Sequence, residues 1–247
     1  MDRNETIYGT RAVMEAIKSG REIEKIFIQS GLTNNLIKEL IATARDHKAP
    51  YSFIPQQKLA KLSAKNHQGV VCLLSAIRYV PLQNLIDKAY SEGRSPFLLI
   101  VDRVTDVRNF GAIARTAECA GLDGIVIEAK GNAPITGDAV KTSAGALSHL
   151  PVSRVQSLPE TLKLLKANGI QIVACTEKAQ QTIYDIDLKL PTALVLGSEE
   201  DGISDEVIRL SDHLAKIPMK GKIASLNVSV AAGIAIYETV RQQRSPE

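Results

Sequence analysis

Hydrophobic positions in the first 77 residues alternate between helical and strand spacing. Residues 10–19 and 34–48 predict amphipathic helices, because their apolar side chains recur at intervals of three and four residues. Shorter apolar runs predict strands at 25–30, 51–54 and 69–77 and one further short helix at 56–64. Since helices can then cover each strand, we expect a small α/β domain over residues 1–77.

The pattern becomes more polar over residues 78–95, which we interpret as a linker because they include Pro81 and Gly93. Alternation resumes at residue 96 and continues to the end of the chain. Apolar strand patterns recur at 97–104, 124–129, 150–155, 170–177, 192–199 and 214–219, with helical patterns between and after them. The first of these strands is apolar throughout, as in a sheet buried on both faces. We therefore expect an α/β fold whose second domain, 96–247, holds a parallel sheet.

Composition places the chain among ordinary globular proteins. Of its 247 residues, 45% are hydrophobic and 23% are charged, as in a typical folded domain. No apolar run approaches the ~18 residues that span a membrane, which excludes an integral membrane protein. The first ten residues contain acids and no apolar core, so we expect no signal peptide and a cytoplasmic protein.

Cysteine and histidine residues show no pattern typical of a disulfide framework or a metal site. The three cysteines are far apart and odd in number, and the four histidines lack ligand spacing. We therefore expect reduced thiols and no bound metal ion.

Charge is distributed unevenly along the chain. Residues 1–77 contain 11 Lys and Arg against 7 Asp and Glu, whereas residues 95–247 contain 16 against 18. A basic front segment on a slightly acidic body fits a module that binds a polyanion, joined to a catalytic module. The alternative is a chance fluctuation of a few charges.

Three loops of the second domain stand out, because ligands of parallel α/β folds bind beyond the carboxyl ends of the strands. These loops cover residues 102–115, 197–204 and 217–229. The first strand is not followed by GxGxxG, and the chain has no GxxxxGKS or GxxxxGKT, which argues against dinucleotide-binding and P-loop enzymes. The GxSxG turn that is typical of α/β-hydrolases is also missing.

The three loops carry NFG at 109–111 with RTAE at 115–118, LGSEEDG at 196–202, and IPM at 217–219 with SLNVS at 225–229. In this order they resemble the three motifs of the SpoU (TrmH-type, SPOUT superfamily) RNA ribose 2′-O-methyltransferases. Near the front, IYGTRAVMEAI and NHQGVV resemble the substrate-binding domain of the family's two-domain members, which is similar to a kink-turn-binding ribosomal-protein fold. One departure is Val107, where the family usually has proline.

The resemblance implies both a fold and an activity. The likeness is greatest to the RlmB-type members, which methylate a guanosine ribose in 23S ribosomal RNA. It implies a homodimer whose C-terminal segment forms a trefoil knot, with no membrane or metal partner. A transfer RNA substrate and a non-catalytic RNA-binding assembly factor of the same fold remain the alternatives.

The resemblance also implies four catalytic residues, Asn109, Arg115, Glu199 and Asn227. Arginine is not normally deprotonated in proteins. Arg115 is therefore either an unusual general base or a bidentate partner for the phosphate next to the target ribose. Asn109 either fixes the loop or the ribose, or caps a helix at 111–121. Glu199 either accepts the hydroxyl proton or orients Arg115 through an ion pair.

S-Adenosyl-L-methionine (AdoMet) is the implied cofactor. The residues implied to bind it are Thr176, Leu196, Gly197, Ser198, Gly202, Ile217, Met219, Ser225 and Leu226. The glycines permit close backbone approach and turning, while the large apolar side chains supply walls. Plain core packing is the alternative for those side chains.

RNA is the implied partner of the front domain. The candidates for contact with its phosphates are Arg11, Lys25, Lys58, Lys61 and Lys65, of which the last three share helical spacing. A solvated lysine face is the alternative. Aromatic residues make up 4% of the chain and there is no Trp, so we expect shape and phosphate contacts to dominate over base stacking.

Overall fold

Contacts divide the chain into two units in the structure, a computed structural model that describes residues 6–62, 66–223 and 225–244. The first unit holds residues 1–78 together with 134–138, and the second holds 79–133 and 139–247. The predicted division at residue 77 lies next to this boundary. Residues 134–138 lie far along the sequence, after a strand of the second unit, and yet belong to the first unit. The hydrophobic pattern did not predict this.

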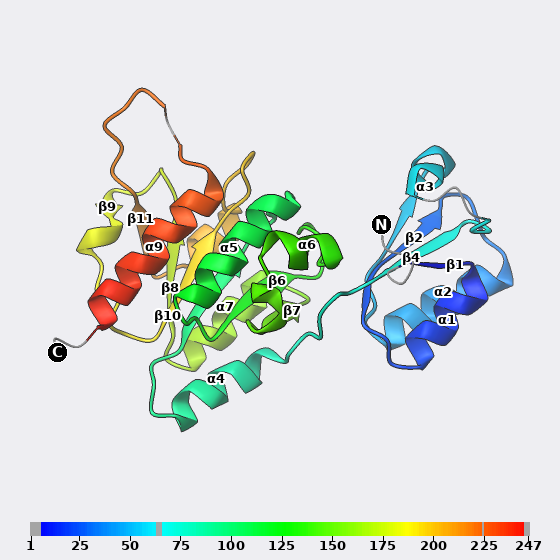
Figure 1. The fold of residues 1–247 in the computed structure, drawn as a ribbon, viewed down its shortest axis with the longest axis horizontal. Coiled ribbons are helices and arrows are strands. Elements are labelled where there is room, and N and C mark those ends of the chain that lie inside the picture. Colours follow the sequence, from blue (N-terminus) through cyan, green and yellow to red (C-terminus); the bar gives the residue numbers. More distant parts are fainter. Residues whose placement is uncertain (1–5, 63–65, 224, 245–247) are drawn as a thin grey trace. The chain divides into compact units, whose positions relative to one another are not determined.

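The first unit is a four-stranded sheet with helices (Figure 1). Its strands, in spatial order, are β1 (Thr6–Tyr8), β4 (Val70–Leu74), β2 (Ile23–Gln29) and β3 (Tyr51–Ile54). Its helices are α1 (Thr10–Lys18), α2 (Asn35–Asp46) and α3 (Gln56–Leu62). Strand β4 is antiparallel to both neighbours, whereas β2 and β3 are parallel. Apolar residues of α1, α2, β2 and β4 form its core. The helices and strands predicted from the sequence therefore pack together as one small α/β unit.

The second unit is built on a parallel sheet of seven strands (Figure 1). In spatial order they are β7 (Val152–Val155), β6 (Gly124–Glu128), β5 (Phe97–Val101), β10 (Thr192–Leu196), β8 (Gln171–Cys175), β11 (His213–Lys216) and β9 (Gln181–Thr182). All of the strand pairs are parallel. Strands β5 and β10 at the centre are buried along their whole length, which explains why both are continuously apolar in the sequence.

Helices cover both faces of this sheet. Alternate residues of the central strands, such as Leu98 and Ile100, join a core with α4 (Leu82–Ser91), α7 (Leu158–Ala167) and α8 (Asp205–Leu210). On the other face α5 (Val107–Cys119) packs against α9 (Val228–Gln243). This face also carries α6 (Gly137–Thr142) and the 3₁₀ turn η1 (Ala146–Ser148) next to α5. A second 3₁₀ turn, η2 (Ile183–Asp185), follows β9 and contacts α9.

Segment 78–95, which we expected to be a linker, contains the ten-residue helix α4. Its Leu82, Leu85 and Ile86 are buried in the core of the second unit, so much of this segment is structural. The polar side chains of α4 lie on the face opposite these buried residues, as in any amphipathic helix. These polar residues are the reason that the sequence of this segment resembles a linker.

Two helices differ from their sequence patterns. The helical pattern over 138–149 is broken, because Ala144 and Gly145 have φ values of 52° and 87°, outside the right-handed helical region. Helix α9 is apolar nearly all round, yet its Val230 and Tyr237 are each 49% exposed in the single chain. The predicted trefoil knot stays a prediction.

Candidate functional site

The three motif loops meet at the carboxyl ends of β5, β10 and β11, where helices α5 and α9 begin. Asp106 caps α5: its carboxylate accepts hydrogen bonds from the backbone N–H groups of Arg108 and Asn109, at 2.7 and 3.2 Å. These bonds lower the pKa of Asp106. The helix therefore begins at Val107 and Asn109 lies inside it, so the alternative in which Asn109 caps a helix at 111–121 is wrong.

A chain of side-chain hydrogen bonds joins the three motifs. The Asn109 amide donates to Glu199 Oε1 at 2.6 Å, and the Asn227 amide donates to Asn109 Oδ1 at 3.1 Å. Asn227 Oδ1 in turn accepts from the backbone N–H and the hydroxyl of Ser229 and so caps α9. We call Glu199, Asn109, Asn227 and Ser229 the relay. It fixes the orientation of both amides, because each amide oxygen accepts and each amide nitrogen donates.

Arg115 lies apart from the relay in the single chain. It follows Asn109 by six residues on α5, which places it about 9 Å further along the helix axis and on a different face. Its side chain is exposed, and no hydrogen bond or ion pair holds it within the part of the chain that the structure describes. Glu199 is bonded to Asn109 instead. The expectation that Glu199 orients Arg115 is therefore not met in this structure.

A cavity of about 690 Å³ opens beside the relay. All nine residues implied to bind the cofactor line it: Thr176, Leu196, Gly197, Ser198, Gly202, Ile217, Met219, Ser225 and Leu226. Glu199 and Asn227 line it too, so the cavity and the relay share two residues. Strands β8, β10 and β11 each contribute residues from their carboxyl ends, as the rule for parallel sheets predicts.

The lining of this cavity fits AdoMet. Leu196, Ile217 and Met219 supply apolar surface for an adenosine group. The carboxylates of Glu177, Glu199, Glu200 and Asp201 supply negative charge for a cofactor that carries a positive sulfonium and an ammonium group. The volume lies within the ~300–1,000 Å³ that is usual for small-molecule sites.

Sequence reasoning missed several residues of this cavity, among them Cys175, Glu177, Lys178 and Ala231. Cys175 ends β8, and burial raises the pKa of its thiol to about 12. The adjacency of β8 to β10 would have pointed to Glu177 and Lys178, but strand order is not readable from one sequence.

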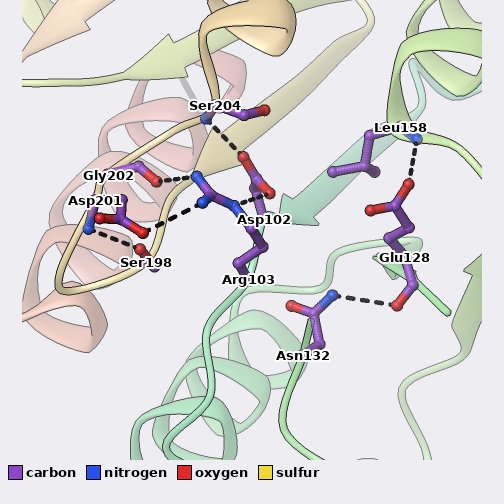
Figure 2. Close-up of polar contacts among 9 residues, drawn as sticks. All are labelled: Asp102, Arg103, Glu128, Asn132, Leu158, Ser198, Asp201, Gly202 and Ser204. Atoms are coloured by element: carbon purple, nitrogen blue, oxygen red, sulfur yellow. Dashed lines mark hydrogen bonds and ion pairs between the residues drawn. The ribbon is translucent and has the colours of Figure 1, made fainter. Parts of the chain in front are cut away.

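Arg103 and Asp102 are further residues at this edge of the sheet that the sequence did not single out (Figure 2). The Asp102 carboxylate accepts from the backbone N–H of Ser204 at 2.8 Å and from Arg103 Nε at 3.1 Å. Arg103 also reaches the carboxylate of Asp201.

The basic candidates of the front unit are scattered over its surface elements. Arg11 lies on α1 and is exposed, and Lys58 and Lys61 are exposed on α3. Lys25 lies half-buried on β2 with its Nζ 5.7 Å from the centre of the Phe27 ring. Lys65 lies outside the described residues. The exposed positions permit contact with an RNA backbone.

The described residues contain neither a metal-binding cluster nor a membrane-spanning helix. Within residues 6–62, 66–223 and 225–244, no group of three or more His, Cys, Asp or Glu side chains is arranged to hold a metal ion. None of the helices in those ranges is both long enough and apolar enough to cross a membrane.

The parallel sheet, the relay and the acidic cavity define an α/β enzyme of the methyltransferase class. Residues 96–237 match the model of the SpoU rRNA methylase family, and residues 6–80 match the domain described as RNA 2′-O ribose methyltransferase substrate binding. The chain belongs to the SpoU family and is an AdoMet-dependent RNA methyltransferase.

Relatives and solved structures agree with this assignment. YacO of Bacillus subtilis (strain 168), assigned to the TrmH family of tRNA/rRNA methyltransferases, is 36% identical over 98% of this chain and 97% of its own length. The SpoU methyltransferase AviRb of Streptomyces viridochromogenes in complex with AdoMet is 27% identical, with a TM-score of 0.60 over 96% of this chain and 89% of that chain. An AdoMet-bound rRNA methyltransferase of Sinorhizobium meliloti is also 27% identical, with a TM-score of 0.61 over 98% and 88%.

Proposed function

We propose that this chain methylates a ribose 2′-hydroxyl of RNA, and that its target is a guanosine of 23S ribosomal RNA. The observation that carries the proposal is the relay, because it joins all three motifs and contributes Glu199 and Asn227 to the lining of the cavity that fits AdoMet. The substrate-binding domain over residues 6–80 supports RNA as the acceptor. Because this domain is that of RNA 2′-O ribose methyltransferases, it also supports the ribose 2′-oxygen as the acceptor atom.

AdoMet, when bound, supplies an electrophilic methyl group, so the task of the protein is to prepare the nucleophile. A ribose hydroxyl is a poor nucleophile while it is protonated, and the enzyme must align it and take its proton. Glu199 is the carboxylate of the relay, and its Oε1 already accepts one hydrogen bond from Asn109. Its second oxygen is the group that we assign to the hydroxyl proton, while Asn109 and Asn227 hold the carboxylate in place.

Arg115 has a separate role in this proposal. Its exposed guanidinium is available to grip the phosphate next to the target ribose through two parallel hydrogen bonds. This role needs no deprotonation of the guanidinium.

We propose that the enzyme is a cytoplasmic homodimer. Val230 and Tyr237 support the dimer: they are seven residues apart on α9, which places them on one face of the helix, and each is 49% exposed. Apolar side chains of this size gathered on one helix face are typical of an interface with another copy or a partner.

Mapping of ribose methylation across ribosomal and transfer RNA, in cells with and without this gene, tests the proposed substrate. We expect one 23S guanosine to lose its 2′-O-methyl group when the gene is deleted and to regain it with the wild-type gene but not with Glu199→Gln. Loss of a transfer RNA methylation instead would replace the proposed substrate. An unchanged map would favour a non-catalytic assembly factor.

A further inference from the structure

The turn of the second motif, residues 198–202, lines the cavity and is held together by hydrogen bonds between its own residues. The backbone of Ser198 and Gly202 exchanges two hydrogen bonds of 3.1 Å, and the Ser198 hydroxyl accepts from the Asp201 N–H at 3.0 Å. We call residues 198–202 the motif-two turn. Since these hydrogen bonds hold the turn together, its position relative to the sheet sets where Glu199 and the cavity wall lie.

Arg103 holds this turn to the end of β5 (Figure 2). Its Nη2 donates to the carbonyl oxygen of Gly202 at 3.1 Å, and its Nη1 lies 3.4 Å from the carboxylate of Asp201. Its Nε donates to Asp102 Oδ1 at 3.1 Å, and the side chain of Asp102 is only 3% exposed. One planar guanidinium thus joins the strand end to both a backbone and a side-chain acceptor of the turn.

The backbone of Arg103 is in an unfavourable conformation that its side chain compensates. Its φ is 62°, in the left-handed region that non-glycine residues rarely occupy. Glycine or asparagine would be the ordinary choice if only the backbone mattered. A missing side chain at Gly131 also leaves room for Arg103, since a Cβ there would lie 3.1 Å from Arg103 Cγ. A strained backbone kept in place by three acceptors is the pattern expected of a functional constraint.

We propose that Arg103 is a positioning residue that fixes the motif-two turn for AdoMet binding. It touches neither the cavity nor the relay in this structure, and it acts through Gly202 and Asp201, which line the cavity. This inference rests on the assignment of the cavity to AdoMet. The competing explanation is that Arg103 only neutralises the buried charge of Asp102.

Two substitutions separate these explanations. Arg103→Gly removes the guanidinium and relieves the backbone at φ 62°, so the folded state should survive while the turn loses its anchor. Arg103→Lys keeps the charge beside Asp102, but an ammonium lacks the planar fork that reaches Asp102 and Gly202 together. Lys48→Gly is a matched control, because Lys48 is exposed and has a φ of 53° in the first unit.

Calorimetric titration of the full chain with AdoMet is the test, with thermal midpoints recorded without cofactor. Arg103→Gly should weaken AdoMet binding by about tenfold, which is about 1.4 kcal/mol. Arg103→Lys should weaken AdoMet binding by at least about threefold. Lys48→Gly should bind like wild type. Wild-type affinity in Arg103→Lys would overturn the positioning role, and so would wild-type affinity in Arg103→Gly. If Arg103→Gly does not fold, Arg103→Lys decides the question.

The wild-type titration keeps this test distinct from the proposed function. If the wild-type chain binds no AdoMet, the assignment of the cavity is overturned. If the wild-type chain binds AdoMet and an Arg103 variant binds it as tightly as wild type does, only the positioning role of Arg103 is overturned. Methyl transfer at saturating AdoMet gives a second readout: it should also fall in Arg103→Gly, because Glu199 lies on the same turn.

Discussion

Gly197→Ala is the substitution that most sharply tests whether the motif-two turn shapes the cofactor site. Gly197 follows β10 and lines the cavity. A Cβ added there would lie 2.1 Å from the carbonyl carbon of Gly202, 2.2 Å from the nitrogen of Ile203 and 2.4 Å from the oxygen of Gly202. All three are backbone atoms, so no side chain can rotate away to make room.

The size of the effect follows from these distances. Ordinary contact begins at about 3.4 Å, so the chain at Gly202 must move by about 1.3 Å to accept the methyl group. Displacements of about 1 Å in an active site cost on the order of 100-fold in rate, and overpacking costs ~1–3 kcal/mol of stability. We therefore expect Gly197→Ala to stay folded, to lose ~100-fold in methyl transfer and to bind AdoMet weakly.

Gly221→Ala is the matched control for this prediction. Gly221 lies in the loop before α9, its φ is not positive, and a Cβ there would meet no atom of the described residues within 4 Å. Calorimetric titration with AdoMet and urea unfolding of both variants measure binding and stability separately. If Gly197→Ala binds AdoMet within twofold of wild type, the turn does not form the wall of the cofactor site and the reasoning fails.

Three further predictions concern other parts of the molecule. Arg115→Ala should abolish methyl transfer but leave AdoMet binding near normal, and Arg115→Lys should restore little activity, because an ammonium lacks the fork; wild-type turnover in either variant would refute the assignment. At pH 8, a thiol-alkylating reagent should label the exposed Cys119 of the folded protein and spare Cys175. Burial raises the pKa of Cys175 to about 12, so its thiol stays protonated at pH 8. Mass spectrometry of the labelled peptides measures this, and labelling of Cys175 in preference to Cys119 would contradict it. The salt dependence of RNA affinity should flatten by about two phosphate contacts when Lys58 and Lys61 are both replaced by Gln, and an unchanged slope would leave these lysines as a solvated face.

Local patterns were sufficient to predict the elements that are long or strongly apolar. Strands β5 and β10 are continuously apolar because the sheet is covered on both faces, and amphipathic spacing predicted α1 and α2. Strand β1, with three residues, and β9, with two, are too short for alternation to be visible. Helix α4 was interpreted as part of a linker because its buried face alternates with polar residues.

The candidate site was less predictable than the fold, because its geometry depends on contacts between distant residues. The motifs brought Asn109, Glu199 and Asn227 into consideration. Only the structure shows that the Asn227 amide donates to the Asn109 amide across 118 residues of sequence, and that the Asn109 amide donates to the Glu199 carboxylate across 90. Arg103 carried no sequence signal at all, since a positive φ cannot be read from residue type when the residue is not glycine.

Methyl transfer itself provides the most direct test of the proposed chemistry. Purified protein would be incubated with AdoMet carrying a labelled methyl group and with unmodified 23S ribosomal RNA or transfer RNA, and the digested nucleosides would be separated and identified by mass spectrometry. We predict label in 2′-O-methylguanosine from ribosomal RNA, and its loss with Glu199→Gln and with Arg115→Ala. Label in a base-methylated nucleoside, or undiminished 2′-O-methylation by both variants, would contradict the proposal that this site activates a ribose hydroxyl.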